Sequence, residues 1–425
     1  MPEQRKKILI MTVGVGGEIR SGILRSIDAQ NPDRVVLLFT TGSWEKHGNA
    51  LIGEITKRGI EIEPDKEATS TESEVDELLP KYLEIIQNEK RNGTVSVDFT
   101  FGTKAMTAAL YLAGLLGGLE KASYVGGKRN DQGTVISGRE RVIIFSYETP
   151  RTAVFCKRLV ELYNSYHYGS ALQIAEQINK ATSSSDNLKK RKTETLYRVC
   201  KLAYLWDKFE FKEASETTLE LLEYAEEAAD LVGSEADPLR IQENIKAVAD
   251  YLAGLTEDEK KKQINQGLVW ELIKNAERKA ANSLWDDAVG RLYRAIEYIG
   301  QLKLYEIGLF DGDRFLPPPP EDESRVPPDL LMALKEGRPL GLRDVYRYLG
   351  LHDPIAKHII EKDDLKQDVK NIIASRNKSI LAHGFRAVGE DAYRAMHQLA
   401  LDLVNAAGIE RPPFDILMLR EDLIL

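Results

Sequence analysis

The sequence of 425 residues predicts an α/β Rossmann-like N-terminal domain followed by an all-α C-terminal region. Three observations lead to this prediction. Short apolar runs alternate with helical stretches over residues 1–150, this alternation stops after Arg151, and amphipathic helical periodicity continues from there to the end. A chain of this length is too long for one compact unit, so we place a domain boundary at residue 150.

Short apolar runs in the first 150 residues are the expected strands. They are continuous rather than alternating, as in strands that are buried on both faces of a parallel sheet covered by helices. In chain order they are Ile8–Met11, Val35–Phe39, Ile60–Ile62, Val95–Phe99, Ala122–Val125 and Val142–Tyr147.

The segments that follow four of these strands point to a ligand. In parallel α/β sheets, ligands bind beyond the carboxyl ends of the strands. Small and hydroxyl-bearing residues there let a ligand approach the backbone, and helix-start amides near Met106, together with Lys104, can hold phosphate oxygens. The four segments are Thr12-Val13-Gly14-Val15-Gly16-Gly17, Thr40-Thr41-Gly42-Ser43, Thr100-Phe101-Gly102-Thr103-Lys104 and Gly126-Gly127-Lys128-Arg129.

Two familiar nucleotide sites fit these segments poorly. A P-loop needs GxxxxGK[ST], but Gly102-Thr103-Lys104 lacks the upstream glycine and the Gly-Lys step. A dinucleotide site needs GxGxxG, but Ile19 stands at the third glycine position, and no acid follows the second strand to hold a ribose. A small-molecule dehydrogenase is therefore disfavoured.

Composition limits the possible partners. The net charge of -9 gives weak long-range attraction for nucleic acid, so any polyanion must be captured by local sites rather than by a basic face. We also expect no DNA partner. No apolar run approaches the roughly 20 residues that span a bilayer, and no secretory signal is visible, so we expect a cytoplasmic protein without a membrane partner. Cys156 and Cys200 lie far apart and form no metal-ligand cluster, which argues against a disulfide scaffold and a zinc site alike. We expect neither a metal nor a resident cofactor.

One run of the N-terminal part resembles a known sensor domain. Asp98-Phe99-Thr100-Phe101-Gly102-Thr103-Lys104-Ala105-Met106-Thr107 is similar to the D-x-T-x-G-T-K-x-M-[ST] run of the CARF domain of CRISPR-associated proteins, although Phe101 stands where glycine is also common. The resemblance covers residues 6–148. It implies that a homodimer binds cyclic oligoadenylate, tetra- or hexa-adenylate, on its two-fold axis. The candidate ligand-binding residues are Thr12, Val13, Gly14, Gly16, Thr41, Gly42, Thr100, Gly102, Thr103, Lys104 and Met106.

The segment Asp364–Ala382 predicts a helix with two polar side chains on its apolar face. Leu365, Val369, Ile373 and Ile380 form one apolar stripe. Arg376 and His383 fall on the same stripe, roughly 10 Å apart along the axis. Because a guanidinium and an imidazole are costly to bury unpaired, the stripe must open into a cleft or meet polar partners.

Arg376-Asn377 followed by His383 resembles the R-x(4-6)-H signature of HEPN ribonucleases, here with six intervening residues. The run Arg376–Phe385 is similar to the CARF–HEPN accessory nucleases of type III CRISPR systems. The resemblance implies a HEPN ribonuclease domain over residues 266–425, which leaves residues 151–265 as a helical linker region. It also implies that two facing motifs of a dimer form one composite site.

The segment Trp285–Glu297 looks like the other long helix of a HEPN domain. Its apolar residues, Tyr293 among them, are expected to belong to the core, as aromatic and aliphatic side chains at helical spacing usually do. Arg291, Arg294 and Glu297 could line the cleft, but a solvated polar face is the favoured interpretation.

The expected activity is a metal-independent endoribonuclease on single-stranded RNA, switched on by cyclic oligoadenylate in antiviral defence. RNA carries its own nucleophile, the 2'-hydroxyl. His383 is assigned as general acid/base, Arg376 as electrostatic stabiliser, and Asn377 as the group that orients Arg376 or the phosphate.

A different class of function stays open, a non-catalytic CARF sensor with a helical dimerisation or partner-binding module. Ring size, RNA preference, degradation of the activator in the CARF domain, the role of residues 151–265, and oligomers beyond the dimer are not decided by the sequence.

Overall fold

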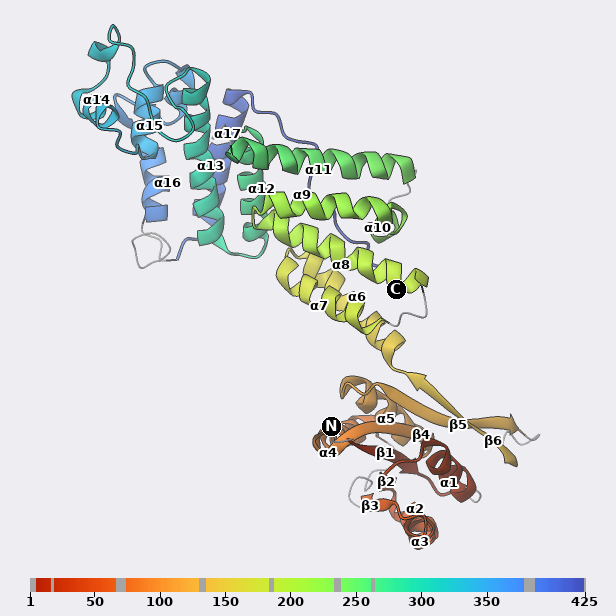
Figure 1. Ribbon diagram of the computed structural model, residues 1–425. Helices are drawn as coiled ribbons and strands as arrows, with labels where there is room; N and C mark the ends of the chain where they lie inside the picture. Colours follow the sequence, from red (N-terminus) through yellow and green to blue (C-terminus); the bar gives the residue numbers. More distant parts are fainter. Residues whose placement is uncertain are drawn as a thin grey trace. The chain divides into compact units, whose positions relative to one another are not determined.

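The protein is described here by a computed structural model, shown in Figure 1. The chain forms two compact units, Met1–Val154 and Phe155–Leu425, with the division inside one helix. The described residues are 5–16, 19–65, 74–129, 135–182, 187–232, 238–260, 264–377 and 387–423.

The first unit is built on a six-stranded sheet with strand order β3-β2-β1-β4-β5-β6. The strands β1 to β5 pair in parallel, and β6 is antiparallel to β5. This mostly parallel sheet confirms the Rossmann-like prediction. The strands are β1 (Lys6–Val13), β2 (Arg34–Phe39), β3 (Glu61–Asp65), β4 (Gly93–Phe101), β5 (Lys121–Arg129) and β6 (Val135–Ser146).

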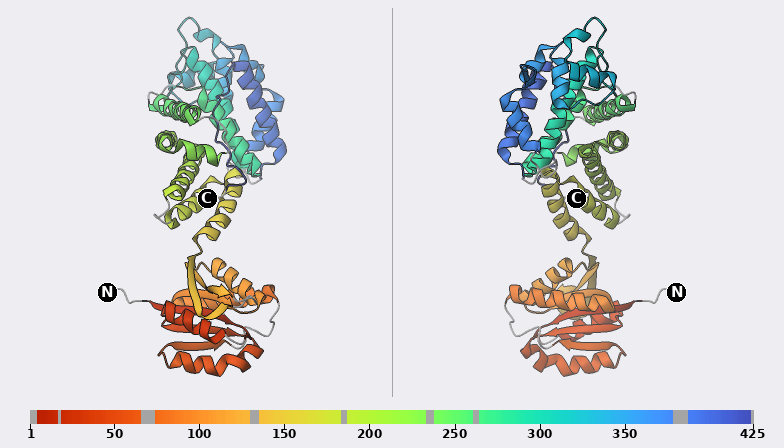
Figure 2. Two further views of the ribbon diagram at one scale, coloured as in Figure 1. Left: turned by 90° about the vertical axis from the view of Figure 1, so that its right-hand side faces the viewer. Right: turned by 90° about the vertical axis from the view of Figure 1, so that its left-hand side faces the viewer.

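Helices cover both faces of this sheet (Figure 2). On one face, α4 (Val75–Asn92) and α5 (Lys104–Leu116) bury side chains of β1, β2 and β4 such as Ile10, Leu38 and Val97. On the other face, α1 (Ile19–Gln30) and α3 (Asn49–Thr56) bury the alternate side chains of β1 and β2. Two short helical segments, α2 (Thr41–Ser43) and η1 (Trp44–Gly48), join β2 to α3. Burial from both sides explains why the strand sequences are continuously apolar.

The last two strands differ from the expectation of a parallel sheet. Only residues 130–134 separate β5 from β6. A parallel crossover needs about a dozen residues, so a connection this short allows only an antiparallel pair. The segment Gly126–Arg129, expected as a loop after the fifth strand, instead belongs to β5, where Gly126 pairs with Arg141 and Gly127 pairs with Glu140.

The second unit is mainly helical, as predicted, and its described part also contains a short hairpin whose two strands have two residues each. Its first part contains α6 (Glu148–Asn164), α7 (Tyr168–Ala181), α8 (Asn187–Asp207), α9 (Phe211–Glu220), η2 (Leu221–Tyr224), α10 (Ala225–Leu231) and α11 (Pro238–Lys260). Its second part contains α12 (Gly267–Ala281), α13 (Trp285–Glu306), η3 (Glu323–Arg325), α14 (Pro328–Lys335), α15 (Leu342–Leu349), η4 (Pro354–His358), β7 (Ile360–Glu361), β8 (Asp364–Leu365), α16 (Gln367–Asn377) and α17 (Glu390–Ala407).

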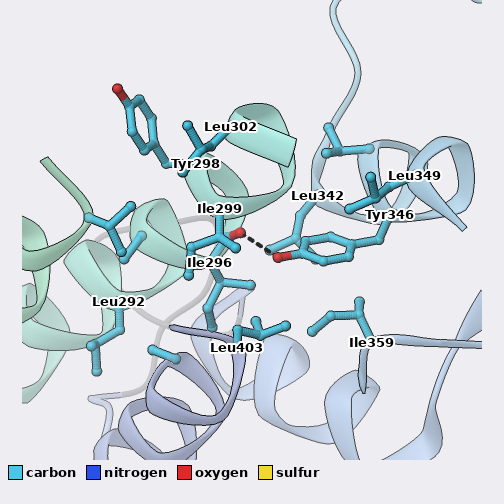
Figure 3. Packing of buried hydrophobic residues seen from close by; sticks show 14 of the residues in the cluster. Leu292, Ile296, Tyr298, Ile299, Leu302, Leu342, Tyr346, Leu349, Ile359 and Leu403 are labelled. Carbon is cyan, nitrogen blue, oxygen red and sulfur yellow. Dashed lines mark hydrogen bonds between the residues drawn. The ribbon is translucent and has the colours of Figure 1, made fainter. Parts of the chain in front are cut away.

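Helix α13 lies at the centre of the core of this second part (Figure 3). Its residues Leu292, Ile296 and Ile299 are fully buried, and α12, α15 and α17 all pack against it. The Tyr346 hydroxyl of α15 donates a hydrogen bond of 2.8 Å to the Ile296 carbonyl. This bond also satisfies the one polar atom of a large buried side chain.

The helix predicted from Asp364 begins later than expected. Asp364 and Leu365 form β8, which pairs with β7 through a turn at Lys362 and Asp363. Both turn residues have positive φ, 49° and 63°, as a two-residue hairpin of type I′ requires. Arg347, almost fully buried, binds Asp363 with an ion pair of 2.8 Å and fixes this turn. The predicted end at Ala382 lies outside the described residues.

The chain after α17 returns to the first part of the second unit. Asn164 of α6 donates to the Leu419 carbonyl at 2.8 Å and accepts from the Leu419 amide at 2.9 Å. Arg420 pairs with Asp230 of α10, and Leu423 joins the core formed by α6, α7 and α8. We call residues 408–423 the return segment. None of the helices in the described part of the chain is long and apolar enough to cross a membrane.

Candidate functional site

The ends of β1, β2 and β4 bring three of the predicted loops side by side. Strand β1 lies between β2 and β4, so its loop contacts both neighbours. A Cβ placed on Gly14 would lie 3.4 Å from the Cα of Gly102, which means that the two backbones touch. A Cβ on Gly42 would lie 3.5 Å from a methyl group of Val15. The Lys46 ammonium donates to the Val15 carbonyl at 2.7 Å and ties the first two loops together.

Gly102 occupies a position with no room for a side chain. A Cβ there would lie 3.0 Å from the Cβ atoms of Met106 and Thr12 and 3.0 Å from the Thr12 hydroxyl oxygen. Thr12 is completely buried, and its hydroxyl has no hydrogen-bond partner among the described residues. The structure therefore brings together four of the predicted ligand-binding residues, namely Thr12, Gly14, Gly102 and Met106.

The start of α5 combines a capped helix end with an exposed cation. The Thr103 hydroxyl accepts a hydrogen bond of 3.2 Å from the Met106 amide, so this side chain caps the helix. Lys104 is the first residue of α5 and is exposed. A positive charge is unfavourable at a helix N-terminus, where the macrodipole is itself positive. An anion at this place would relieve the repulsion.

Thr100 is held by a buried carboxylate beneath the loop. Asp98 accepts hydrogen bonds from the amide and the hydroxyl of Thr100 with one oxygen, and from Ser26 and Ser123 with the other. Burial raises the pKa of the Asp98 carboxyl, against the opposing effect of these hydrogen bonds. The Thr100 hydroxyl in turn accepts from the Val125 amide at 2.7 Å. This network fixes the end of β4 and the turn into Gly102.

The remaining predicted ligand-binding residues at this edge differ in how far they are exposed to solvent. Val13 is fully buried in the core beneath α1 and α3, so only its backbone is available to a ligand. Thr41 is exposed at the first position of α2, while Thr40 and Ser43 cap that segment reciprocally. Gly16 is exposed, and a Cβ there would lie 2.9 Å from a methyl group of Ile19.

His47 is a buried polar side chain at this edge that sequence patterns do not single out. It is 2% exposed, and neither ring nitrogen has a hydrogen-bond partner in the described part of the chain. It lies in η1, a π-helical turn, which is a rare conformation that recurs near functional sites. A lone histidine in sequence carries no signal of this kind.

In the second unit, the described part of the predicted catalytic motif is Arg376. It lies in the last turn of α16, with its guanidinium carbon 4.6 Å from the centre of the Tyr293 ring on α13. Asn377 ends the helix, but its side chain lies outside the described residues, and so does all of His383. Tyr293, expected as part of the core, is half-buried and contacts Arg376.

The cations of α13 beside Tyr293 are engaged in local ion pairs. Arg291 binds Asp287 one turn earlier at 2.9 Å and also donates to Asn275 of α12. Arg294 binds Glu297 at 2.9 Å and Gln301 at 2.9 Å. Both arginines are half-buried, so the structure places them between a solvated face and the core.

Helix α12 carries a buried ionic network that sequence reasoning missed. Glu271 is 1% exposed and accepts hydrogen bonds from Trp206 at 2.6 Å and Tyr251 at 2.7 Å. Lys274 is 2% exposed, and burial lowers the pKa of its ammonium group; it donates to the Phe414 carbonyl of the return segment. No sequence signal pairs these residues, because their partners lie far away in the chain. In the described ranges, no group of three or more His, Cys, Asp or Glu side chains could hold a metal ion.

Comparison with known proteins shows what a segment of the second unit and the fold of the chain are similar to. Residues 256–407 match a family model described as the Csm6 HEPN domain. A solved structure of Enterococcus italicus Csm6, bound to cyclic hexa-2'-fluoro-hexa-dAMP, is similar to this chain with a TM-score of 0.52 and 16% sequence identity. The alignment covers 94% of this chain and 95% of that chain. A search of curated proteins found no match.

Proposed function

Because residues 256–407 belong to the Csm6 HEPN domain family and the whole chain has the Csm6 fold, we propose that this protein is a cytoplasmic CARF–HEPN endoribonuclease of type III CRISPR defence. Cyclic oligoadenylate binds the first unit and activates metal-independent cleavage of single-stranded RNA by the second. The observation that carries the proposal is the HEPN match, which includes both Arg376 and His383.

The edge formed by β1, β2 and β4 is the proposed activator site. Touching glycine backbones at Gly14 and Gly102 leave a surface that a large ring can approach closely. Lys104, exposed at the start of α5, gains a favourable partner when a phosphate binds there. The Enterococcus italicus protein is bound to a ring of six nucleotides. Cyclic hexa-adenylate is therefore the first ring to test, with cyclic tetra-adenylate beside it.

The exposed face of α5 supports a homodimer through the first unit. Ala108, Leu112 and Leu116 lie four residues apart on this face and are exposed, with 37% exposure for Leu112 and 62% for Leu116. No charged residue occurs between Lys104 and the end of the helix. A surface helix normally carries a polar outer face, so an apolar one fits burial against a second copy.

Arg376, Asn377 and His383 are the proposed catalytic residues. His383 takes a proton from the 2'-hydroxyl or returns one to the leaving oxygen, since imidazole titrates near neutrality. Arg376 stabilises the negative charge that develops on the phosphate, and Asn377 orients that arginine or the phosphate. The expected products end in a 2',3'-cyclic phosphate and a 5'-hydroxyl.

A cleavage assay on labelled single-stranded RNA tests the proposal. Cyclic tetra-adenylate or cyclic hexa-adenylate should stimulate cleavage in the presence of EDTA, and His383→Ala should abolish this cleavage. Ligand binding without cleavage would instead identify a non-catalytic sensor with a helical partner-binding module. The same reactions, followed over time, show whether the activator ring is degraded.

A further inference from the structure

Arg376 and Tyr293 come together from helices that are far apart in sequence. The guanidinium carbon of Arg376 lies 4.6 Å from the ring centre of Tyr293, well within the distance at which a cation is attracted to the face of an aromatic ring. Both side chains are half-buried. At such a place the attraction is stronger than in open solvent, because less water screens it.

The two helices differ in how firmly the core holds them at this contact. Next to Tyr293, Leu292 and Ile296 of α13 are fully buried, and the Ile296 carbonyl accepts the Tyr346 hydrogen bond. On α16, Val369 is fully buried, but Ile372 and Ile373 are only partly covered. The ring therefore stands on the more firmly packed element, and the arginine stands at the end of the less firmly packed one.

Tyr293 presents a neutral ring to the guanidinium. Burial raises the pKa of its hydroxyl, and the nearby Glu297 carboxylate adds to this effect, while Arg376 opposes it. The phenol stays protonated at neutral pH, so the contact is that of a cation with a ring face rather than an ion pair.

We propose that Tyr293 is a positioning residue for the ribonuclease site, whose ring face fixes the guanidinium of Arg376 for the scissile phosphate. This inference rests on the proposed function, since Tyr293 acts through Arg376. Without the ring, the guanidinium loses the contact that orients it from α13 and is correctly placed in a smaller share of the molecules, so kcat falls while RNA binding stays nearly unchanged.

The test uses the full-length protein, activated by cyclic hexa- or tetra-adenylate, with kcat and KM measured on one labelled RNA. Tyr293→Leu should lower kcat about 5- to 30-fold with KM within about twofold. Tyr293→Phe keeps the ring face and should restore kcat to within about twofold of the starting protein. The matched control is Tyr305→Leu, since Tyr305 is also half-buried on α13 against the same core and should leave kcat unchanged.

A fluorinated series separates ring electrostatics from packing and does not depend on the leucine variant folding. Phenylalanine and pentafluorophenylalanine, each incorporated at position 293, have nearly the same shape, but fluorine removes the negative charge of the ring face. We expect kcat to fall on fluorination while thermal stability and activator affinity stay constant. Equal kcat for the two rings, or an active Tyr293→Leu variant, would overturn the positioning role. Absence of cleavage by the starting protein itself would instead overturn the proposed function.

Discussion

The two candidate sites of this protein are built in opposite ways. In the first unit, loops from three neighbouring strands touch through their backbones, as Gly14 and Gly102 do, and a buried carboxylate holds the end of β4. In the second unit, the described part of the motif is one arginine at the end of a helix, lying on a ring from another helix. Backbone geometry therefore shapes the first site, whereas the described feature of the second is a contact between two side chains. Substitutions should affect the two sites differently.

The largest expected effect concerns Arg376, at the end of α16. Arg376→Ala should lower kcat for RNA cleavage about 100- to 1,000-fold, because it removes the charge that stabilises the transition state. Affinity for cyclic oligoadenylate should not change, because the residue belongs to the other unit. Single-turnover cleavage and calorimetric titration of the activator measure the two quantities. A variant that cleaves RNA normally would remove Arg376 from the catalytic residues.

Gly102→Ala at the sheet edge should weaken activator binding and leave kcat for RNA cleavage unchanged. Gly102→Ala places a Cβ 3.0 Å from Thr12 and Met106, and overpacking of this kind costs roughly 1–3 kcal/mol. The activator should bind on the order of tenfold more weakly, while kcat at saturating activator is retained. Gly53→Ala is the matched control, because no atom lies within 4 Å of a Cβ there. Equal activator affinities for the two variants would contradict the proposed place of the ligand.

Substitutions at the return segment should lower the stability of the second unit and leave that of the first unit unchanged. Asn164→Ala removes both hydrogen bonds to Leu419 and should destabilise the second unit by about 1–2 kcal/mol in urea unfolding. Asp422→Ala, at an exposed ion pair of the same segment, should change it by less than about 0.5 kcal/mol. If the first unit lost as much stability as the second, the two would not be independent folding units.

The buried carboxylate beneath the first site gives the smallest effect, a dependence on pH. Because burial raises the pKa of Asp98 in the folded state, folding favours the protonated form, and its stabilising effect is complete below the pKa of the unfolded chain. The free energy of unfolding of the starting protein should therefore fall as pH rises from about 4 through the raised pKa. The Asp98→Asn variant, which has no carboxyl at this position, should not show this fall. Hydrogen exchange of the β4 amides at several pH values measures this difference. A constant difference between the two proteins would show that the carboxyl does not titrate differently on folding.

The fold and one of the two sites are largely predictable from the sequence, because local patterns determine them. Continuous apolar runs identify the strands, and the rule that loops meet at the carboxyl edge of a parallel sheet is enough to bring Thr12, Gly14 and Gly102 together. The antiparallel β6 is also implied by its short connection, but apolar content alone does not give strand direction.

What the sequence does not predict depends on partners distant in the chain. The face of α16 that carries Arg376 follows from helical periodicity, but the identity of Tyr293 as its partner requires the packing of α16 against α13. An aromatic side chain at helical spacing usually belongs to the core, so periodicity alone gives Tyr293 no other role. The predicted start of α16 is wrong by one short strand, because the hairpin at Lys362 and Asp363 lacks the glycine or asparagine that normally marks such a turn.

The return segment also has a consequence for the order in which the chain folds during synthesis. Asn164 and its partner Leu419 are separated by 255 residues. At a translation rate of about 5–20 residues per second, the helices around Asn164 leave the ribosome roughly 10–50 s before the segment that completes their core. During that interval they expose apolar surface that Leu419 and Leu423 later cover. In the cell this part of the nascent chain is therefore prone to aggregation until synthesis is complete.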